Sequence, residues 1–201
     1  MNRKIALFVL ICCLLSAPAC GADGGASWLE RLRTAVKSFG EYEVRFELTT
    51  TDDYAATGSY RVAGDRYLIS MPQGRVCCDG RARYEVNDAA REVVIDAVDT
   101  ASHNLLDNPV RAFDFVGEQF DVRTVAEQAD RITLRLTPRD GAGLTTIELT
   151  LDKRSALPVA VVYGAEDLQI RVKIVSFAKS ATAFPAFRRA DFSGYEWIDF
   201  R

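Results

Sequence analysis

The spacing of apolar residues predicts one helix near the start of the chain, followed by strands. After Ser27, apolar residues lie three or four positions apart as far as Phe39, and Gly40 follows them. This spacing places them on one side of a helix, so an amphipathic helix is expected over residues 27–38. From Glu41 onwards the apolar spacing changes to two, which is the period of a β-strand.

Four segments alternate apolar and polar residues strictly enough to predict long strands. Their apolar positions are Tyr42, Val44, Phe46 and Leu48; Ile132, Leu134 and Leu136; Ile147, Leu149 and Leu151; and Leu168, Ile170, Val172 and Ile174. Neighbouring residues of a strand point to opposite faces of a sheet, so each of these strands is expected to have one apolar and one polar face.

Shorter strands are expected between and beside the long ones. They lie at residues 58–62, 66–71, 75–78, 83–87, 92–97 and 159–164. Turn-forming pairs such as Asp79-Gly80 and Asn87-Asp88 separate several of them. Because parallel strands need crossover connections of about a dozen residues, this close succession favours an antiparallel meander.

Two further helical segments are expected to cover the sheet. Asn108 before Pro109 is typical of a helix start, with Ala112, Phe113 and Val116 on one side, and a short helical stretch is expected over residues 100–106. A sheet with one apolar face must curl around that face and be covered. The predicted fold class is therefore α+β, mainly β: an incomplete antiparallel β-barrel with covering α-helices and an apolar cavity.

The start of the chain has the features of a secretory signal peptide. Arg3 and Lys4 precede a continuous apolar run over residues 5–15, and small residues follow as far as Ala19. The run is too short to span a bilayer. We therefore expect residues 1–19 to be removed, and one exported, periplasmic domain to occupy residues 20–201. Cys20 leaves a second interpretation open, in which the protein is lipid-anchored through this residue.

The sequence has few residues suited to catalysis or metal binding. His103 is the only histidine, and a surface or capping role in a loop is expected for it. Cys77 and Cys78 are adjacent, so one thiol is expected to pack inward and the other to point outward. The sequence has none of the common hydrolase, phosphate-loop or zinc-site motifs. We expect no enzyme activity, no cofactor and no metal, and the even spread of positive charge argues against nucleic acid as a partner.

Several short segments occur in an order and spacing similar to those of a known family. They are Tyr42-Glu43-Val44-Arg45-Phe46, Gly58-Ser59-Tyr60-Arg61-Val62, Gly64-Asp65-Arg66-Tyr67, Cys78-Asp79-Gly80-Arg81, Asn108-Pro109 before Phe113, Leu136-Thr137-Pro138, and Trp197-Ile198-Asp199-Phe200-Arg201. Together they resemble the periplasmic outer-membrane lipoprotein carriers, the LolA-like proteins. The resemblance extends over essentially the whole chain after the leader.

The resemblance implies a half-barrel of about eleven strands, with helices as a lid over a cavity that receives the acyl chains of lipoproteins. In this chain the cavity would be lined by Trp28, Leu32, Val44, Phe46, Leu48, Leu134, Leu136, Leu149, Ile170 and Val172. The best-studied relatives hold the lid with an arginine. That position falls here at Ala63-Gly64, and Arg66 is the nearest candidate for the same contact.

The function expected from this resemblance is that of a monomeric carrier that takes lipoproteins to the outer membrane. Its partners would be the acyl chains of lipoproteins, an inner-membrane release complex and an outer-membrane acceptor. The alternative is an outer-membrane receptor or envelope lipid sensor of the same fold, lipidated at Cys20.

Overall fold

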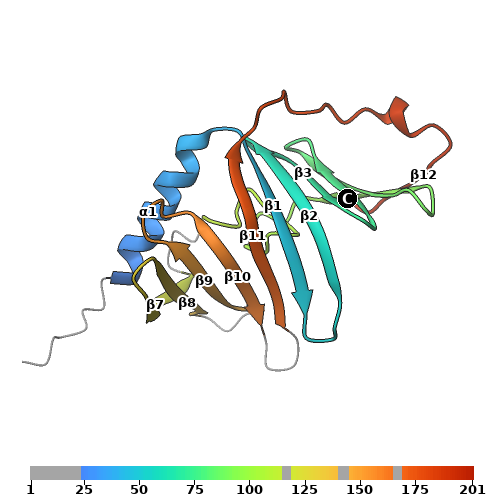
Figure 1. Cartoon of the computed structure of the whole chain (residues 1–201). Coiled ribbons are helices and arrows are strands. Elements are labelled where there is room, and N and C mark those ends of the chain that lie inside the picture. The colour runs from blue at the N-terminus through green and yellow to red at the C-terminus, as the bar shows by residue number, and fades with distance from the viewer. Residues whose placement is uncertain (1–23, 115–118, 140–144, 165–168) are drawn as a thin grey trace, which may run out of the picture.

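One strongly curved β-sheet forms most of the molecule (Figure 1). The structure is a computed structural model that describes residues 24–114, 119–139, 145–164 and 169–201. Its elements are α1 (Gly24–Phe39), β1 (Tyr42–Thr50), β2 (Ala55–Ala63), β3 (Arg66–Met71), β4 (Gly74–Cys78), β5 (Ala82–Asn87), β6 (Glu92–Ala97), β7 (Phe120–Glu127), β8 (Arg131–Pro138), β9 (Thr146–Asp152), β10 (Pro158–Gly164), β11 (Gln169–Lys179), the 3-10 helix η1 (Arg189–Phe192) and β12 (Glu196–Asp199). The strands form one twelve-stranded sheet in the order β12-β6-β5-β4-β3-β2-β1-β11-β10-β9-β8-β7. The sheet stays open between β12 and β7, so the predicted mainly β, incomplete barrel is confirmed.

The first helix lies against the β7 end of the sheet (Figure 1). It begins at Gly24, earlier than the sequence indicated, and it buries Leu29 and Leu32. A Cβ atom built on Gly25 would lie 2.9 Å from Cγ1 of Val122 in β7. The helix can therefore approach β7 this closely only because Gly25 has no side chain.

The antiparallel pair β1–β11 forms the centre of the sheet. Leu48 lies opposite Val172 and Phe46 opposite Ile174, so the predicted apolar phases of both strands meet on one face. A bulge follows in β11, where Val175 is 56% exposed, and Phe177 then lies opposite Val44. The extra residue brings Phe177 back to the apolar face.

The concave face of the sheet carries the main core. Its buried members include Val44, Phe46, Leu48, Tyr60, Tyr67, Leu134, Leu136, Leu149, Leu151, Val161 and Val172. Residues of the opposite phase lie on the outer face, where Lys173 pairs with Glu47 at 2.9 Å and Arg135 with Glu148 at 2.6 Å. The predicted strand phases are thus confirmed in β1, β8 and β9, and in β11 from Ile170 onwards; Leu168 lies outside the described residues.

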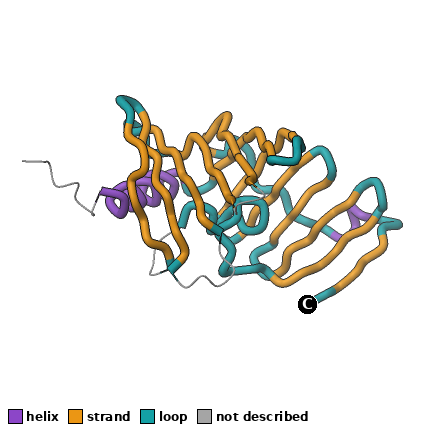
Figure 2. Tube along the Cα trace, turned by 90° about the horizontal axis from the view of Figure 1, so that it is seen from below, coloured by secondary structure: helices purple, strands orange, loops and turns teal. Residues whose placement is uncertain are grey.

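The first part of the connection from β6 to β7, residues 98–114, lies inside the curve of the sheet, where Figure 2 draws it as loop. We name residues 98–114 the covering segment. Its described residues form turns, in which the amides of Arg111 and Asp114 donate to carbonyls three residues earlier. The helix expected after Asn108 is therefore absent over residues 109–114. Residues 115 and 116 lie outside the described part of the chain.

Asn108 has a different role from the predicted helix cap. Its side-chain Nδ2 donates to the carbonyl of Asp99 at 2.9 Å and ties two turns of the covering segment together. The short helical stretch expected over residues 100–106 is also wrong, because Asn104 uses its side chain to accept the amide of Leu106 and so forms a turn.

The apolar side of the sheet changes face towards β12. Cys78 belongs to the concave core, whereas Cys77 lies opposite Tyr84 on the outer face. In β5 and β6 the buried residues Val86 and Val93 follow the phase of Tyr84 and so lie on the outer face as well. The prediction of a single apolar side is therefore wrong for this end of the sheet.

The chain after β11 covers this outer face. We name residues 180–195 the C-terminal strap, which leaves β11, crosses the sheet and returns at β12 (Figure 1). Phe192 packs on Val86 and Val93, and Phe187 stacks on Tyr84 with ring centroids 4.3 Å apart. The strap thus builds a second, smaller core on the face opposite the first.

Two strands were not predicted from the sequence. β7 is mostly exposed and lacks a regular alternation, and β12 has only four residues. β12 pairs with β6 in parallel, with Trp197 opposite Val93. The sheet thus has one strand more than the resemblance implied and one parallel pair that the predicted meander did not include.

The second core makes a prediction about stability. Phe192 is only 8% exposed, so Phe192→Ala should lower the free energy of unfolding by roughly 2–4 kcal/mol. Phe200→Ala is the matched control, because that ring is 70% exposed, and it should change stability by less than about 0.5 kcal/mol. Urea unfolding measures the stability of both variants. Equal losses of stability in Phe192→Ala and Phe200→Ala would contradict the second core.

Candidate functional site

The residues predicted to line a cavity come together on the concave face. They are Trp28 and Leu32 of α1, Val44, Phe46 and Leu48 of β1, Leu134 and Leu136 of β8, Leu149 of β9, and Ile170 and Val172 of β11. All are buried except Trp28 and Ile170, which are partly buried and pack on the same core. Side chains from the two halves of the chain therefore share one apolar surface.

The covering segment occupies this surface. Leu105 is fully buried in the concave core, and Ala112 and Phe113 are buried with it. The residues that the resemblance assigns to a cavity are thus packed beneath the segment and α1. The structure corresponds to a closed arrangement, in which any guest on this surface would replace contacts made by the covering segment.

Two tyrosines of the sheet bind the backbone of the covering segment. The hydroxyl of Tyr67 donates to the carbonyl of Asp107 at 2.9 Å, and the hydroxyl of Tyr163 accepts the amide of Leu105 at 3.1 Å. Burial raises the pKa of both phenols above the usual range, so both remain protonated, and the hydroxyl of Tyr163 donates in turn to the carbonyl of His103 at 3.5 Å. Sequence reasoning missed these contacts, although a tyrosine in the buried phase of a strand needs a partner for its hydroxyl.

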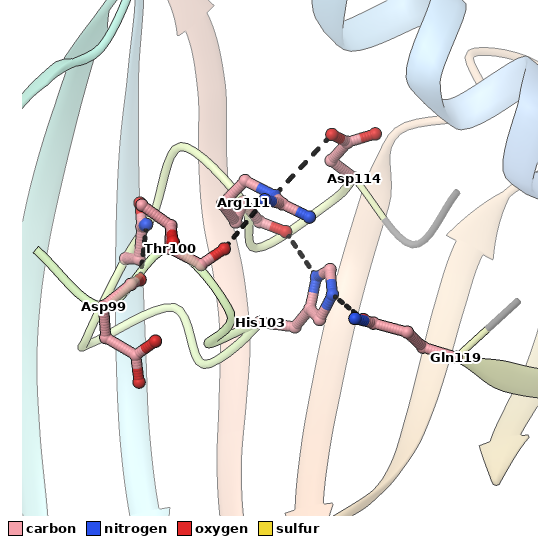
Figure 3. Close-up of polar contacts among 7 residues, drawn as sticks. Asp99, Thr100, His103, Arg111, Asp114 and Gln119 are labelled. Atoms are coloured by element: carbon pink, nitrogen blue, oxygen red, sulfur yellow. Dashed lines mark hydrogen bonds and ion pairs between the residues drawn. The ribbon is translucent and has the colours of Figure 1, made fainter. Parts of the chain in front are cut away.

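His103 is a buried anchor of the covering segment and is 4% exposed. Its Nδ1 lies 3.0 Å from the carbonyl of Arg111, and its Nε2 lies 3.1 Å from Oε1 of Gln119 (Figure 3). The ring also meets Phe120 edge-on, with centroids 5.5 Å apart. The expected surface position was therefore wrong. Because both ring nitrogens and one ring edge are engaged within the fold, the role is structural.

Arg111 closes the polar network around His103 (Figure 3). Its guanidinium donates to the carbonyl of Thr100 at 2.8 Å and lies 3.7 Å from the carboxylate of Asp114. The covering segment is thus held to itself through residues far apart along it, and to the sheet through a few polar contacts at its edges.

Arg66 contacts the C-terminal strap instead of the covering segment. Its guanidinium lies 4.9 Å from the ring centre of Phe184, on the outer face. The structure therefore places the predicted lid contact on the opposite side of the sheet. The tyrosines described above make the contacts with the covering segment.

The two thiols are placed as the sequence predicted, with Cys78 inward and Cys77 on the outer face. Both are free, and burial raises the pKa of Cys77 to about 11. A thiol that stays protonated at neutral pH is a weak nucleophile. Cys77 is therefore best described as a packed residue.

A pocket of about 410 Å³ opens at the rim of the concave face. Its apolar wall comes from α1, β1, β2 and the covering segment, through Val36, Tyr42, Val62, Val110 and Phe113. Arg33 and Lys37 of α1 and Arg111 lie around it, with Asp65 and Asp114. We name this the rim pocket.

The described ranges lack the features of two other classes of site. Those ranges contain no group of three or more His, Cys, Asp or Glu side chains placed to hold a metal ion. No helix among them is both long and apolar enough to cross a membrane. The leader and Cys20 lie outside the residues that the structure describes.

Comparison with known proteins gives similarity at the level of fold. No family model and no curated protein sequence matches the chain. Among solved structures, an uncharacterized conserved protein from Thermus thermophilus is similar with a TM-score of 0.56 and 10% identity, over 87% of this chain and 98% of that one.

Two further structures fall below a TM-score of 0.5. A LolA superfamily protein from Nitrosomonas europaea has a TM-score of 0.45 and 9% identity, over 79% of this chain and 94% of that one. MucB has a TM-score of 0.49 and 21% identity, over 82% of this chain and 62% of that one, so this chain spans less than two thirds of the MucB chain.

The buried position of His103 can be tested by replacement. His103→Phe keeps a ring beside Phe120 but removes the buried contacts of both ring nitrogens, to the Arg111 carbonyl and to Gln119, which should cost about 1–3 kcal/mol of stability. Amide hydrogen exchange should rise in the covering segment more than in β1, as followed by mass spectrometry. If His103→Phe changes neither stability nor amide hydrogen exchange, the result would instead support the surface position expected from the sequence.

Proposed function

We propose that this protein is a carrier that binds acyl chains on the concave face and takes part in moving lipoproteins to the outer membrane. The observation that supports it most is the continuous apolar surface contributed by β1, β8, β9, β11 and α1, which is covered by a segment outside the sheet. The resemblance to LolA-like carriers supports the choice of ligand. The proposal involves no chemical step, cofactor or metal.

The energetics allow an acyl chain to compete with the covering segment. Burying Leu105 and Phe113 is worth roughly 1.5–3 kcal/mol each, and each polar contact to the sheet adds about 1 kcal/mol. An acyl chain of about sixteen carbons, at about 0.8 kcal/mol per buried CH₂, gains roughly 12 kcal/mol. Part of this gain is lost in ordering the chain and the displaced segment. The two states are therefore close enough in free energy for binding to shift the segment.

The direct test of the proposal introduces a charge on the concave face. Leu149→Asp should abolish binding of a fluorescent lipopeptide, because an unpaired carboxylate in an apolar site is costly to desolvate. Thr150→Asp is the matched control: the next residue of β9 lies on the outer face beside Thr133 and should tolerate the charge. Circular dichroism checks that each variant folds.

A second variant keeps the test decisive if Leu149→Asp does not fold. Ile170 is only partly buried and lies at the start of β11, so Ile170→Asp places the same charge at the edge of the apolar surface. Folded Ile170→Asp should bind the lipopeptide at least tenfold more weakly than the parent. The proposed site would be contradicted if folded Ile170→Asp binds the lipopeptide as tightly as the parent. It would also be contradicted if Thr150→Asp weakens binding as much as the charges on the concave face.

The location and partners belong to the same proposal. A carrier would be exported with residues 1–19 as its leader, act as a monomer in the periplasm, receive lipoproteins from an inner-membrane release complex and deliver them to an outer-membrane acceptor. Mass spectrometry of the mature N-terminus tests this, and we expect a chain that begins at an unmodified Cys20. A diacyl adduct on Cys20 would instead support the anchored receptor or sensor.

A further inference from the structure

One buried tyrosine hydroxyl of the concave face has no hydrogen bond to any residue that the structure describes. Tyr60 of β2 is 0% exposed and lies between Val44 of β1 and Ile69 of β3. Its ring is 6.3 Å from that of Tyr42 and 6.2 Å from that of Phe46, measured between centroids. Within the described part of the chain, its hydroxyl makes no hydrogen bond.

Two other buried tyrosines of the concave face make this unpaired hydroxyl informative. The hydroxyls of Tyr67 and Tyr163 are bonded to the backbone of the covering segment. Buried polar groups in proteins are nearly always bonded, and one left unpaired is destabilising. A phenylalanine in place of Tyr60 would avoid this cost and keep the same packing. The unpaired hydroxyl therefore points to a partner that is bound in another state of the protein.

A second unpaired atom lies on the covering segment itself. Oδ1 of Asn108 is buried and lacks a hydrogen bond to any described residue. The preceding residue, Asp107, accepts the hydroxyl of Tyr67, and Tyr67 lies opposite Val62, two residues along β2 from Tyr60. Tyr60 of the sheet and Asn108 of the covering segment thus each have one buried polar atom without a hydrogen bond among the described residues.

The position of Tyr60 relative to the rim pocket suggests how a lipid would lie. Tyr42 and Val62 line that pocket, and Val62 is separated from Tyr60 by one position of β2. Residues two apart in a strand are about 7 Å apart on one face. Beyond Tyr60, the apolar face continues along β1 through Phe46 to Leu48. A lipid bound along this line would have its polar head group near the rim pocket. The linkage to the acyl chain would lie beside Tyr60, and the hydrocarbon tail would extend towards Leu48.

We propose that the hydroxyl of Tyr60 donates a hydrogen bond to the carbonyl that joins an acyl chain to its head group. The inference rests on the proposed carrier function and adds that the site recognises acyl carbonyls as well as hydrocarbon. Esters and amides share this carbonyl. An amide also carries an N–H group, which Oδ1 of Asn108 can accept.

The test measures how three unlabelled ligands displace a fluorescent fatty acid from the full-length mature protein. The ligands are methyl laurate, lauramide and tridecane, which carry an ester, an amide and neither group. Tyr60→Phe should lower the affinities for methyl laurate and lauramide by roughly tenfold, because one buried hydrogen bond is lost. The affinity for tridecane should stay unchanged. Thermal unfolding of the ligand-free variant should be unaffected or shifted upward, because the removed hydroxyl has no bond to lose.

Tyr67→Phe provides the matched control, since it also removes one phenol oxygen. This change breaks the bond to Asp107 and loosens the covering segment. It should therefore lower thermal stability and change the affinities of all three ligands by the same factor. A stronger effect of Tyr60→Phe on lauramide than on methyl laurate would identify the amide as the favoured linkage.

The failures of the two proposals can be told apart. If the parent protein binds none of the probes, the carrier function is wrong. If the parent binds them and Tyr60→Phe leaves all affinities unchanged, or weakens tridecane as much as the ester, the role of Tyr60 is wrong and the carrier function stands.

Discussion

The whole structure depends on the burial of one apolar face of an open sheet. A closed barrel buries its inner face by its own curvature, but here the strands end at β12 and β7 without meeting. The concave residues must then be covered by parts of the chain that are not strands. α1 and the covering segment meet this requirement, and the segment does so through a few buried side chains and a small set of polar contacts. This makes it the part of the core best suited to being exchanged for another apolar molecule.

The outer face of the same sheet also has apolar residues that must be covered. Beyond β4 the buried residues lie on the outer side, and the C-terminal strap covers them with aromatic rings. Arginines stack on several of these rings, with Arg189 4.4 Å from the centre of Trp197 and Arg75 5.5 Å from that of Phe192. The two cores involve different covering elements, so loosening one does not require loosening the other.

Much of the fold followed from local alternation of residues. The sequence could predict that Phe46, Leu134 and Leu149 point to the buried face, because a shift of one position would bury charged residues instead. β5 also alternates, but period two alone does not say which face of a sheet is inside, so the change of face at Val86 was missed. β7 was missed because its exposed residues give no pattern. The contacts of His103 and Tyr67 join residues that are distant in sequence, and no local signal specifies them.

The pairing of β1 with β11 divides the molecule into two runs of adjacent strands joined along one seam. Across this seam, Lys173 reaches Glu47, which precedes it by 126 positions. During synthesis, β1 therefore presents an unpaired edge until β11, more than a hundred residues later, has been made. Pairings between such distant residues form slowly, and unpaired edges invite association with other chains. The long separation of β1 and β11 thus gives this protein an extended interval in which an unpaired strand edge can associate with other chains.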